Sequence, residues 1–425
     1  MSKAPVPATG RTTRQHSFAA LRHPGYRAYF VGNALAMMAD SIEHVISYWV
    51  MFQKFHSPAL GGFAVVSHWV PFLLFGVWSG ALADRFDPRR IIQLGMILFM
   101  GCSVAWGALF VSDSLGLWQA VAILIVHGIA SVLWGPSSQV LIHDIVGTEH
   151  LGSAIRLAAT SRYLGLLAGP AVGGVFLLVF GPALGLLVNV AIYLPLTLWL
   201  VSAPYGPRFR KVAIVSARIR GLTDLLTTVA TVARIRVIAA MTLLTGASAL
   251  MIGNAYQAQM PEFARDLGHG DPGMLYGLLL GADATGAFVA GVVLEGSGWL
   301  QPRARSAFIL AAMWCAAIGG FAASPTYPFA LMFLCAAGFL ELSFNSMAQT
   351  LVQLNAPTPV RGRVIGLYGM SGIGLRAFSG LTVGIGGSFL GIHMSLGICA
   401  ILLMAAIATL ALSLRTGAVA ARAGD

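Results

Sequence analysis

Long apolar stretches dominate this chain and restrict what it can fold into. Its 425 residues contain twelve stretches of about 20 residues or more, the length at which a helix crosses the hydrocarbon layer of a membrane. Apolar residues make up 57% of the chain and charged residues only 10%, against about 25% in soluble proteins. This composition excludes a soluble fold and a disordered chain, and it indicates that the surrounding solvent is a bilayer.

The apolar stretches are expected to be helices. The alternation of polar and apolar residues that is typical of membrane β-barrels is absent, and a helix is the other way to satisfy the backbone in lipid. The fold class is therefore all-α, a polytopic membrane protein with twelve transmembrane helices. The expected spans are residues 28–53, 60–84, 91–112, 116–142, 153–180, 182–202, 237–260, 274–296, 306–323, 327–354, 364–389 and 392–414.

The basic residues predict the orientation of these spans. With the N-terminus inside, 22 of the 26 lysines and arginines fall in inner segments, and the outer loops hold only Lys54 and Arg265. An asymmetry of this size is typical of the positive-inside rule. The net charge of +11 is therefore interpreted as membrane topology and not as a nucleic-acid site. Residues 1–25 do not read as a signal peptide, and both termini are expected in the cytoplasm.

An internal repeat predicts how the chain is divided. A shift of 210 residues pairs the segment from Leu141 with that from Leu351, with seven identities in 34 positions. This repeat favours two pseudo-symmetric six-helix bundles. A surface helix between Gly221 and Val232 is the alternative to a plain linker between the bundles. The expected parts are an N-terminal tail (1–25), a first bundle (26–202), a cytoplasmic linker (203–236), a second bundle (237–414) and a C-terminal tail (415–425).

The loop after the second span carries the most specific motif, GALADRFDPRR from Gly80 to Arg90. It resembles the GxxxDRxGRR loop of the major facilitator superfamily, with Asp87-Pro88 where the family usually has a glycine. Glycine permits close helix approach, and Asp84 can face the positive N-terminus of another helix. The alternative is a loop whose charges only anchor the helix end. The expected cytoplasmic gate comprises Gly80, Asp84, Arg85, Arg89, Arg90, Arg361 and Arg363, with a degenerate counterpart at Gly291 and Glu295.

Two further motifs refine the resemblance. The fifth span reads GLLAGPAVGG, which resembles the GxxxGPxxGG motif of superfamily exporters and antiporters. Its glycines form a smooth packing face and its proline bends the helix. The expected helix-5 seam comprises Gly165, Gly169, Pro170, Gly173 and Gly174. The phrase RGRVIGLYG from Arg361 resembles the bacterial drug and siderophore exporters, including those of enterobactin and macrolides. The RxxxQG motif that many proton antiporters carry in helix 4 is absent.

Ionisable residues inside the spans predict the transport pathway, because charge at bilayer depth is costly. Asn33, Asp40 and His44 share one face of the first span, and Asp40 is the favoured proton-binding group, with Glu43 as second choice. The four acids in the spans outnumber the two arginines, so at least one acid is expected to be protonated, paired with histidine or hydrated. Purely structural pairing is the alternative. The expected proton and substrate residues are Asp40, Glu43, His44, His68, Arg162, Asp283, Glu341, Asn345 and Arg376.

These features predict a secondary active transporter. The superfamily resemblance implies alternating access, and the expected activity is proton-coupled export of a small amphipathic or cationic compound. Alternatives are a dedicated siderophore or metabolite exporter, a facilitator or importer, and remotely a membrane signalling or assembly partner without transport. P-loop, GxSxG and HExxH motifs are absent, so no enzyme, cofactor or metal is expected. The expected partners are the substrate, protons and membrane lipid, and the expected state is a monomer in a bacterial inner membrane.

Overall fold

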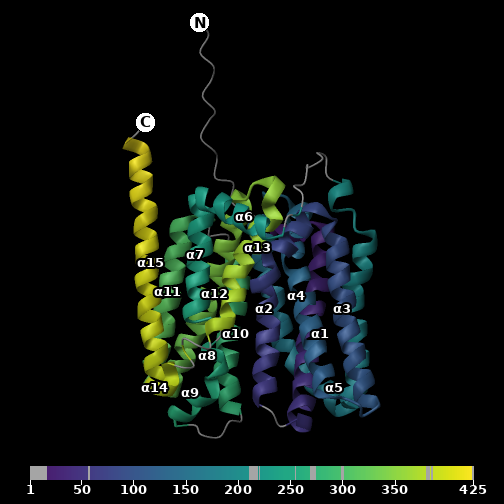
Figure 1. Ribbon diagram of the computed structural model, residues 1–425. Coiled ribbons are helices and arrows are strands. Elements are labelled where there is room, and N and C mark those ends of the chain that lie inside the picture. Colours follow the sequence, from purple (N-terminus) through teal and green to yellow (C-terminus); the bar gives the residue numbers. More distant parts are fainter. Residues whose placement is uncertain are drawn as a thin grey trace.

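The fold is a bundle of helices that stand side by side (Figure 1). The computed structural model describes residues 17–55, 58–209, 219, 221–253, 255–268, 274–297, 301–379, 383 and 386–423. Every described element is a helix, so the all-α prediction is confirmed for this part of the chain. The start of α1 and the end of α15 lie at the same end of the bundle, which we call the terminal end (Figure 1).

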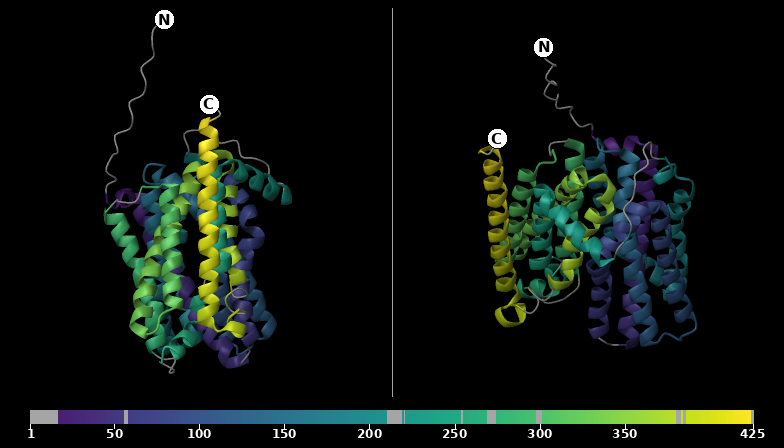
Figure 2. Two further views of the ribbon diagram at one scale, coloured as in Figure 1. Left: turned by 90° about the vertical axis from the view of Figure 1, so that its left-hand side faces the viewer. Right: turned by 45° about the horizontal axis from the view of Figure 1, so that its top comes forward.

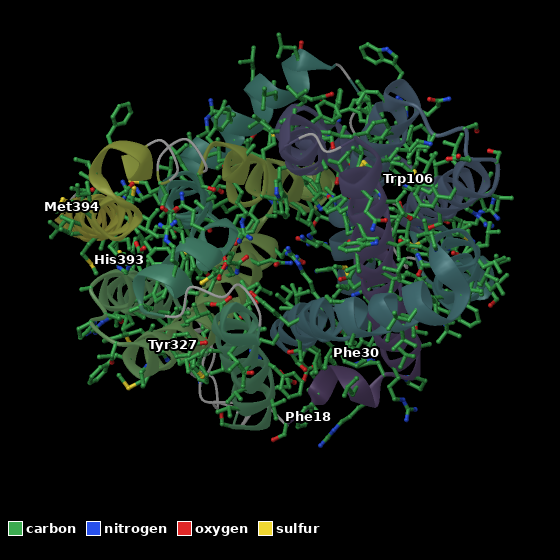
Figure 3. The ribbon with its side chains drawn as sticks, turned by 90° about the horizontal axis from the view of Figure 1, so that it is seen from below. Phe18, Phe30, Trp106, Tyr327, His393 and Met394 are labelled. Carbon is green, nitrogen blue, oxygen red and sulfur yellow. The ribbon has the colours of Figure 1, made fainter. Side chains whose placement is uncertain are left out.

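The helices gather into two groups. The first group contains η1 (Ala19–Arg22), α1 (Pro24–Phe55), α2 (Pro58–Arg85), α3 (Pro88–Val111), α4 (Leu117–Val146) and α5 (Leu151–Ser202). The second group contains α7 (Arg236–Met251), α8 (Ala255–Ala258), α9 (Met260–Asp266), α10 (Met274–Ser297), α11 (Ala304–Ala322), α12 (Tyr327–Asn355), η3 (Thr358–Val360), α13 (Arg361–Gly372), η4 (Gly374–Phe378), α14 (Gly386–Leu390) and α15 (Ile392–Ala423). Seen from the opposite end, Phe30 and Trp106 belong to one group and Tyr327 and His393 to the other (Figure 3).

The connection between the groups contains η2 (Pro207–Phe209) and α6 (Leu222–Arg234). Helix α6 crosses the terminal end and projects beyond the bundle (Figure 2). Its buried side contains Asp224, Thr228 and Val232, whereas Leu222 and Leu226 on the other side are 72% and 64% exposed. The surface helix that the sequence offered as an alternative to a plain linker is therefore present.

Local sequence explains where the long helices begin and break. Pro88 opens α3 directly after Asp87, whose side chain accepts a 3.0 Å hydrogen bond from the backbone N–H of Arg89. A capping acid followed by proline is a strong helix start. Within α5 the backbone turns at Gly181, where φ is +70°, a conformation that glycine adopts without strain. This break separates the two predicted spans 153–180 and 182–202.

The structure corrects two of the predicted spans. The seventh, predicted over 237–260, breaks near Gly253, where φ is +47°, so that α7 and the short α8 replace one helix. The eleventh, predicted over 364–389, consists of α13, η4 and α14, with residues 380–382 and 384–385 outside the described part. Nine of the described helices are long and apolar enough to cross a membrane, so the count of twelve stays a prediction, as do the bounds of the two bundles.

Each group has its own apolar core, and much of the outer surface is apolar. One core surrounds Tyr256, Phe263 and Phe321 of the second group, and others surround Phe99 and Trp106 of the first. Leu178 is nevertheless 86% exposed and Phe389 is 82% exposed. Large exposed apolar side chains of this kind suit a lipid environment. Two smaller apolar clusters join the groups, one that contains Leu133 and Ile365 and one in which Tyr163 packs against α10 and α12.

Candidate functional site

A buried histidine between two carboxylates forms the centre of the first group. His127 of α4 places Nε2 2.9 Å from Asp40 Oδ1 and Nδ1 2.9 Å from Glu43 Oε1. Both acids lie on α1, three residues apart, so one turn of helix holds them on either side of the ring. The Nδ1 contact with Glu43 has hydrogen-bond geometry. A neutral imidazole carries one N–H, so both nitrogens face carboxylates favourably only when the ring is doubly protonated or one carboxyl holds the proton. This triad of Asp40, His127 and Glu43 is therefore a proton-binding arrangement.

The two acids of the triad have different surroundings. Ser103 donates a short hydrogen bond to Glu43, and Asn189 lies 3.4 Å from the Ser103 hydroxyl. The Glu43 side chain is only 2% exposed, whereas that of Asp40 is 11% exposed. His44 lies one turn beyond Asp40 and is 22% exposed, with Nδ1 2.8 Å from the Asp40 carbonyl oxygen. Asp40 therefore faces the more accessible side of the cluster.

Two further histidines extend the triad. The ring centroids of His44 and His68 are 5.2 Å apart, and those of His44 and His127 are 4.7 Å apart. The three histidines bring one ring nitrogen each within 4.8 Å, a spacing that metal ligands can also show. Both nitrogens of His127 already face carboxylates, however, so a metal ion would have to displace one of these contacts. The donor set of this cluster suits protons better than a metal.

The second group carries its own pair of buried acids. Glu341 of α12 accepts a 3.2 Å hydrogen bond from Arg376 of η4, and Arg376 also donates to the carbonyl oxygen of Gly372. Asp283 of α10 accepts hydrogen bonds from Gln257 at 3.0 Å and from the Tyr256 hydroxyl at 3.3 Å. Arg376 and Glu341 line a small pocket together with Asn345. The structure thus places the predicted residues in two clusters, one in each group.

Asp84 joins the two groups at the terminal end. Its carboxylate accepts hydrogen bonds from the backbone N–H groups of Gly362 at 2.5 Å and Arg363 at 3.1 Å, at the start of α13. The helix N-terminus carries partial positive charge, so the contact is charge-assisted. Gly80 makes it possible, because a Cβ there would overlap the Gly362 carbonyl oxygen. This is the predicted contact between Asp84 and a helix N-terminus, while its role as a gate stays a prediction.

The basic residues of the predicted gate separate into two sets. Arg363 is 2% exposed, and its Nε lies 3.2 Å from Asp224 of α6. Arg361 lies 3.1 Å from Nδ1 of His143 on α4. The remaining three stay within the first group: Arg89 pairs with Asp87, Arg90 donates to Gln93, and Arg85 lies on the exposed surface beside Phe86.

A second contact at the same end repeats the Asp84 arrangement. Glu295 of α10 lies 2.7 Å from Arg156 of α5 and accepts a short hydrogen bond from Ser153. Gly291 allows α10 to approach Thr160 of α5. The sequence indicated Gly291 and Glu295 as a degenerate copy of Gly80 and Asp84, but it did not single out Arg156 or Ser153. The internal repeat was the available signal for this contact. With its shift of 210 residues, Gly152, the neighbour of Ser153, aligns with Gly362, whose backbone N–H binds Asp84.

The glycine-rich segment of α5 packs against α1. A Cβ at Gly165 would meet Met37 and Met38, and one at Gly169 would overlap Ser41. Gly173 approaches Ile42 and Val45, whereas nothing lies within 4 Å of a Cβ at Gly174. Pro170 lies inside the helix and is exposed. Three of the four predicted seam glycines therefore lie at the contact with α1, and Gly174 lies apart from it.

Sequence reasoning missed the residues that complete these clusters. It treated His127 only as a span residue, and Ser103, Asn189, Gln257 and Asp224 received no role. All but Asn189 contact a predicted residue on a different helix, and Asn189 bonds Ser103, which in turn donates to Glu43. A polar residue in an apolar span was the available signal for His127, Ser103 and Asn189.

Comparison with known proteins identifies the family to which this chain belongs. The model of the family described as transmembrane secretion effector, within the major facilitator superfamily, matches residues 15–423. The chain belongs to this family. Members of the superfamily are transporters. The relatives found for this chain are named as transporters or as putative multidrug resistance proteins.

Two curated relatives and one solved structure illustrate the similarity. The Staphyloferrin A transporter of Staphylococcus aureus is 22% identical over 36% of this chain and 38% of its own length. The putative multidrug resistance protein MdtD of Cronobacter sakazakii is 31% identical over 23% of this chain and 19% of its own length. The match therefore spans well under half of either relative. The transporter FucP, solved in an outward conformation, is 13% identical with a TM-score of 0.70 over 91% of this chain and 98% of that one, which shows the shared fold.

Proposed function

We propose that this protein is a secondary active transporter that exports a small amphipathic compound in exchange for protons. The observation that carries the proposal is the buried triad, in which His127 lies 2.9 Å from both Asp40 and Glu43. Three titratable groups in contact inside a membrane bundle bind or release a proton at a much lower cost than an isolated charge.

The contacts at the terminal end support alternating access. The Asp84 contact with α13 and the Glu295 contact with Arg156 both join the first group of helices to the second. Polar contacts of this kind can break and re-form, because their groups are satisfied by water when separated. We propose that the terminal end is cytoplasmic, that it is closed in this state, and that its opening alternates with opening of the other end.

The driving force is proton entry. One charge that crosses a potential of 100 mV is worth about 2.3 kcal/mol, which supports a concentration ratio of about 50-fold at about 1.4 kcal/mol per tenfold. Under this proposal a proton on the triad favours one facing state, and the substrate replaces it in the other. The protein works as a monomer in the inner membrane of a bacterium, with lipid around the exposed apolar side chains.

Export is favoured over import by two features. The GxxxGPxxGG segment packs closely on α1 through Gly165 and Gly169, and the multidrug resistance protein MdtD is among the relatives. The relative named Staphyloferrin A transporter supports a dedicated siderophore exporter as the second candidate.

The test is uptake into everted vesicles, in which export appears as accumulation. Vesicles that contain the wild-type protein are energised by a pH gradient and screened with dyes and siderophores, and vesicles without the protein serve as control. The proposal expects accumulation that stops when the gradient is collapsed. Accumulation that persists without a gradient would instead favour a facilitator, and uptake in right-side-out vesicles alone would favour an importer.

A further inference from the structure

Arg162 of α5 is a cation at bilayer depth that has no carboxylate within ion-pair distance among the described residues. The other arginine within the spans, Arg376, pairs with Glu341, and Arg156 near the start of α5 pairs with Glu295. Only two acids of the chain lie outside the described part: one, Asp271, belongs to the connection between α9 and α10, and the other is the last residue. Among the described residues, Arg162 therefore differs from Arg376 and Arg156 in lacking a carboxylate counter-ion.

The position of Arg162 is between the two groups of helices. Its neighbour Ser161 accepts a 2.8 Å hydrogen bond from Asn33 of α1, and its other neighbour Tyr163 packs against α10 and α12. The side chain of Leu164 is 36% exposed, and we take its direction as the outer side of α5. Because a helix turns about 100° per residue, the side chain of Arg162 points about 200° around the helix axis from that of Leu164. Its guanidinium interacts electrostatically with Arg376 and Glu341 on one side and with Asp40 on the other.

An anionic ligand would supply the missing partner. A partly buried arginine without a counter-ion is costly in a membrane. Its planar guanidinium binds carboxylate, sulfonate or phosphate groups through two parallel hydrogen bonds. Arg376 is already neutralised by Glu341, so the three groups together carry one positive charge. A small pocket lies beside Arg376 in the second group, and we place the remainder of the compound between the two groups of helices, next to Arg162.

We propose that Arg162 binds an anionic group of the transported compound, with Arg376 of the second group as an additional hydrogen-bond donor. The inference rests on the proposed export function and deepens it by naming the substrate class. That class is an amphipathic organic anion, whereas the sequence suggested a small amphipathic or cationic compound. The compound would contact both groups of helices at once, as alternating access requires.

The experiment measures binding to the purified full-length protein. The probes share one naphthyl skeleton and differ in charge: 2-naphthoate, 2-naphthalenesulfonate and 2-naphthyl phosphate, neutral methyl 2-naphthoate, and cationic 2-naphthylmethylamine. Dissociation constants come from ligand fluorescence at constant ionic strength. We expect at least one anion to bind the wild type more tightly than the ester and the amine. Arg162→Gln should weaken that binding about tenfold or more, the loss expected for a charge-assisted hydrogen bond.

Two variants separate charge from folding. Arg162→Lys keeps the charge but lacks the planar guanidinium, so it should lose less anion binding than Arg162→Gln. Arg265→Gln removes an exposed arginine of α9 and should bind as the wild type does. A wild type that prefers no anion in the panel, or Arg162→Gln with undiminished anion binding, would overturn the proposal. Displacement of the bound anion by phosphatidylglycerol at lower concentration than by any probe would assign Arg162 to lipid and also overturn it.

Failure of the transport proposal gives a different result. The same probes are offered to everted vesicles under a pH gradient. Anion binding that depends on Arg162, without gradient-driven uptake of any compound, would leave the binding site standing and remove the export function. Uptake of the amine alone, unaffected by Arg162→Gln, would keep transport and remove the anion site.

Discussion

Asp40 and Glu43 contact the same imidazole but differ in what else surrounds them. Glu43 is held by Ser103 as well as His127 and is 2% exposed, whereas Asp40 is 11% exposed and lies beside His44. A carboxyl that exchanges protons with a water-filled pathway must be reachable from it. At the scale of single residues, Asp40 is therefore the better candidate for the coupling group, and Glu43 is a positioning group that orients His127.

Asp40→Asn should uncouple the transporter, because asparagine imitates a carboxyl that is permanently protonated. We expect exchange of substrate down its gradient to survive and pH-driven accumulation to fall to the level of empty vesicles. The measurement is proton release when substrate is added to purified protein in weakly buffered detergent. Equal proton release by the wild type and by Asp40→Asn would show that Asp40 is not the coupling group. Glu43→Gln is the matched comparison and should retain proton release.

At the scale of elements, the predicted gate is the contact between the end of α2 and the start of α13. Asp84 accepts two backbone hydrogen bonds from α13, while Arg363 of that helix also reaches Asp224 of α6. Three elements thus meet at one arginine and two carboxylates. The linker helix is part of the closed end and not only a tether between the two groups.

Asp84→Asn should weaken this closed end. A hydrogen bond to a charged acceptor exceeds a neutral one by about 1 kcal/mol, so the loss over two bonds shifts the equilibrium toward the open state by about tenfold or more. Transport should slow sharply while membrane insertion stays intact. Asp87→Asn is the matched control, since Asp87 bonds only Arg89 among the gate residues. Wild-type transport by a well-inserted Asp84→Asn protein would contradict the gate.

At the scale of the whole molecule, the terminal end joins helices that are far apart in sequence. Gln353 of α12 donates a 3.0 Å hydrogen bond to Gln139 of α4. Cysteines at these two positions, joined through a bis-methanethiosulfonate whose spacer covers the reach of the two glutamine side chains, should hold the terminal end closed. We expect the cross-linked double variant to stop transport and to resume it after reduction, with each single cysteine variant active throughout. A fully cross-linked protein that still transports would show that this end does not open.

The orientation of the bundle can be tested with two conservative substitutions. Ser202 lies at the terminal end of α5, and Ser114 lies in the connection between α3 and α4 at the other end; both are exposed. In a background without the four native cysteines, Ser114→Cys should react with a membrane-impermeant maleimide in intact cells, and Ser202→Cys only after lysis. The excess of basic residues at the terminal end is the reason. Labelling of both positions in intact cells would break the predicted topology.

The sequence by itself determined the membrane class, most of the helix positions and the residues at bilayer depth. Hydropathy accumulates over contiguous residues, so spans such as α3, α4 and α12 agree with their prediction, and Gly181 marks the break in α5. The contact of Asp84 with a helix N-terminus also followed from a local motif and the chemistry of helix ends.

Only the tertiary structure decided which of these residues meet. His127 faces Asp40 and Glu43, Arg156 pairs with Glu295, and Arg162 forms no ion pair with an acid of the described residues, because the rotation and register of each helix depend on packing against its neighbours. The breaks that end α7 and α13 have the same origin: Gly253 lies against Ser379, and Gly374 lies against Leu73. Hydropathy along the chain carries no information on how one helix is rotated about its axis relative to another. That rotation determines which charged side chains meet at the triad of Asp40, His127 and Glu43, and that Arg162 remains for the proposed ligand.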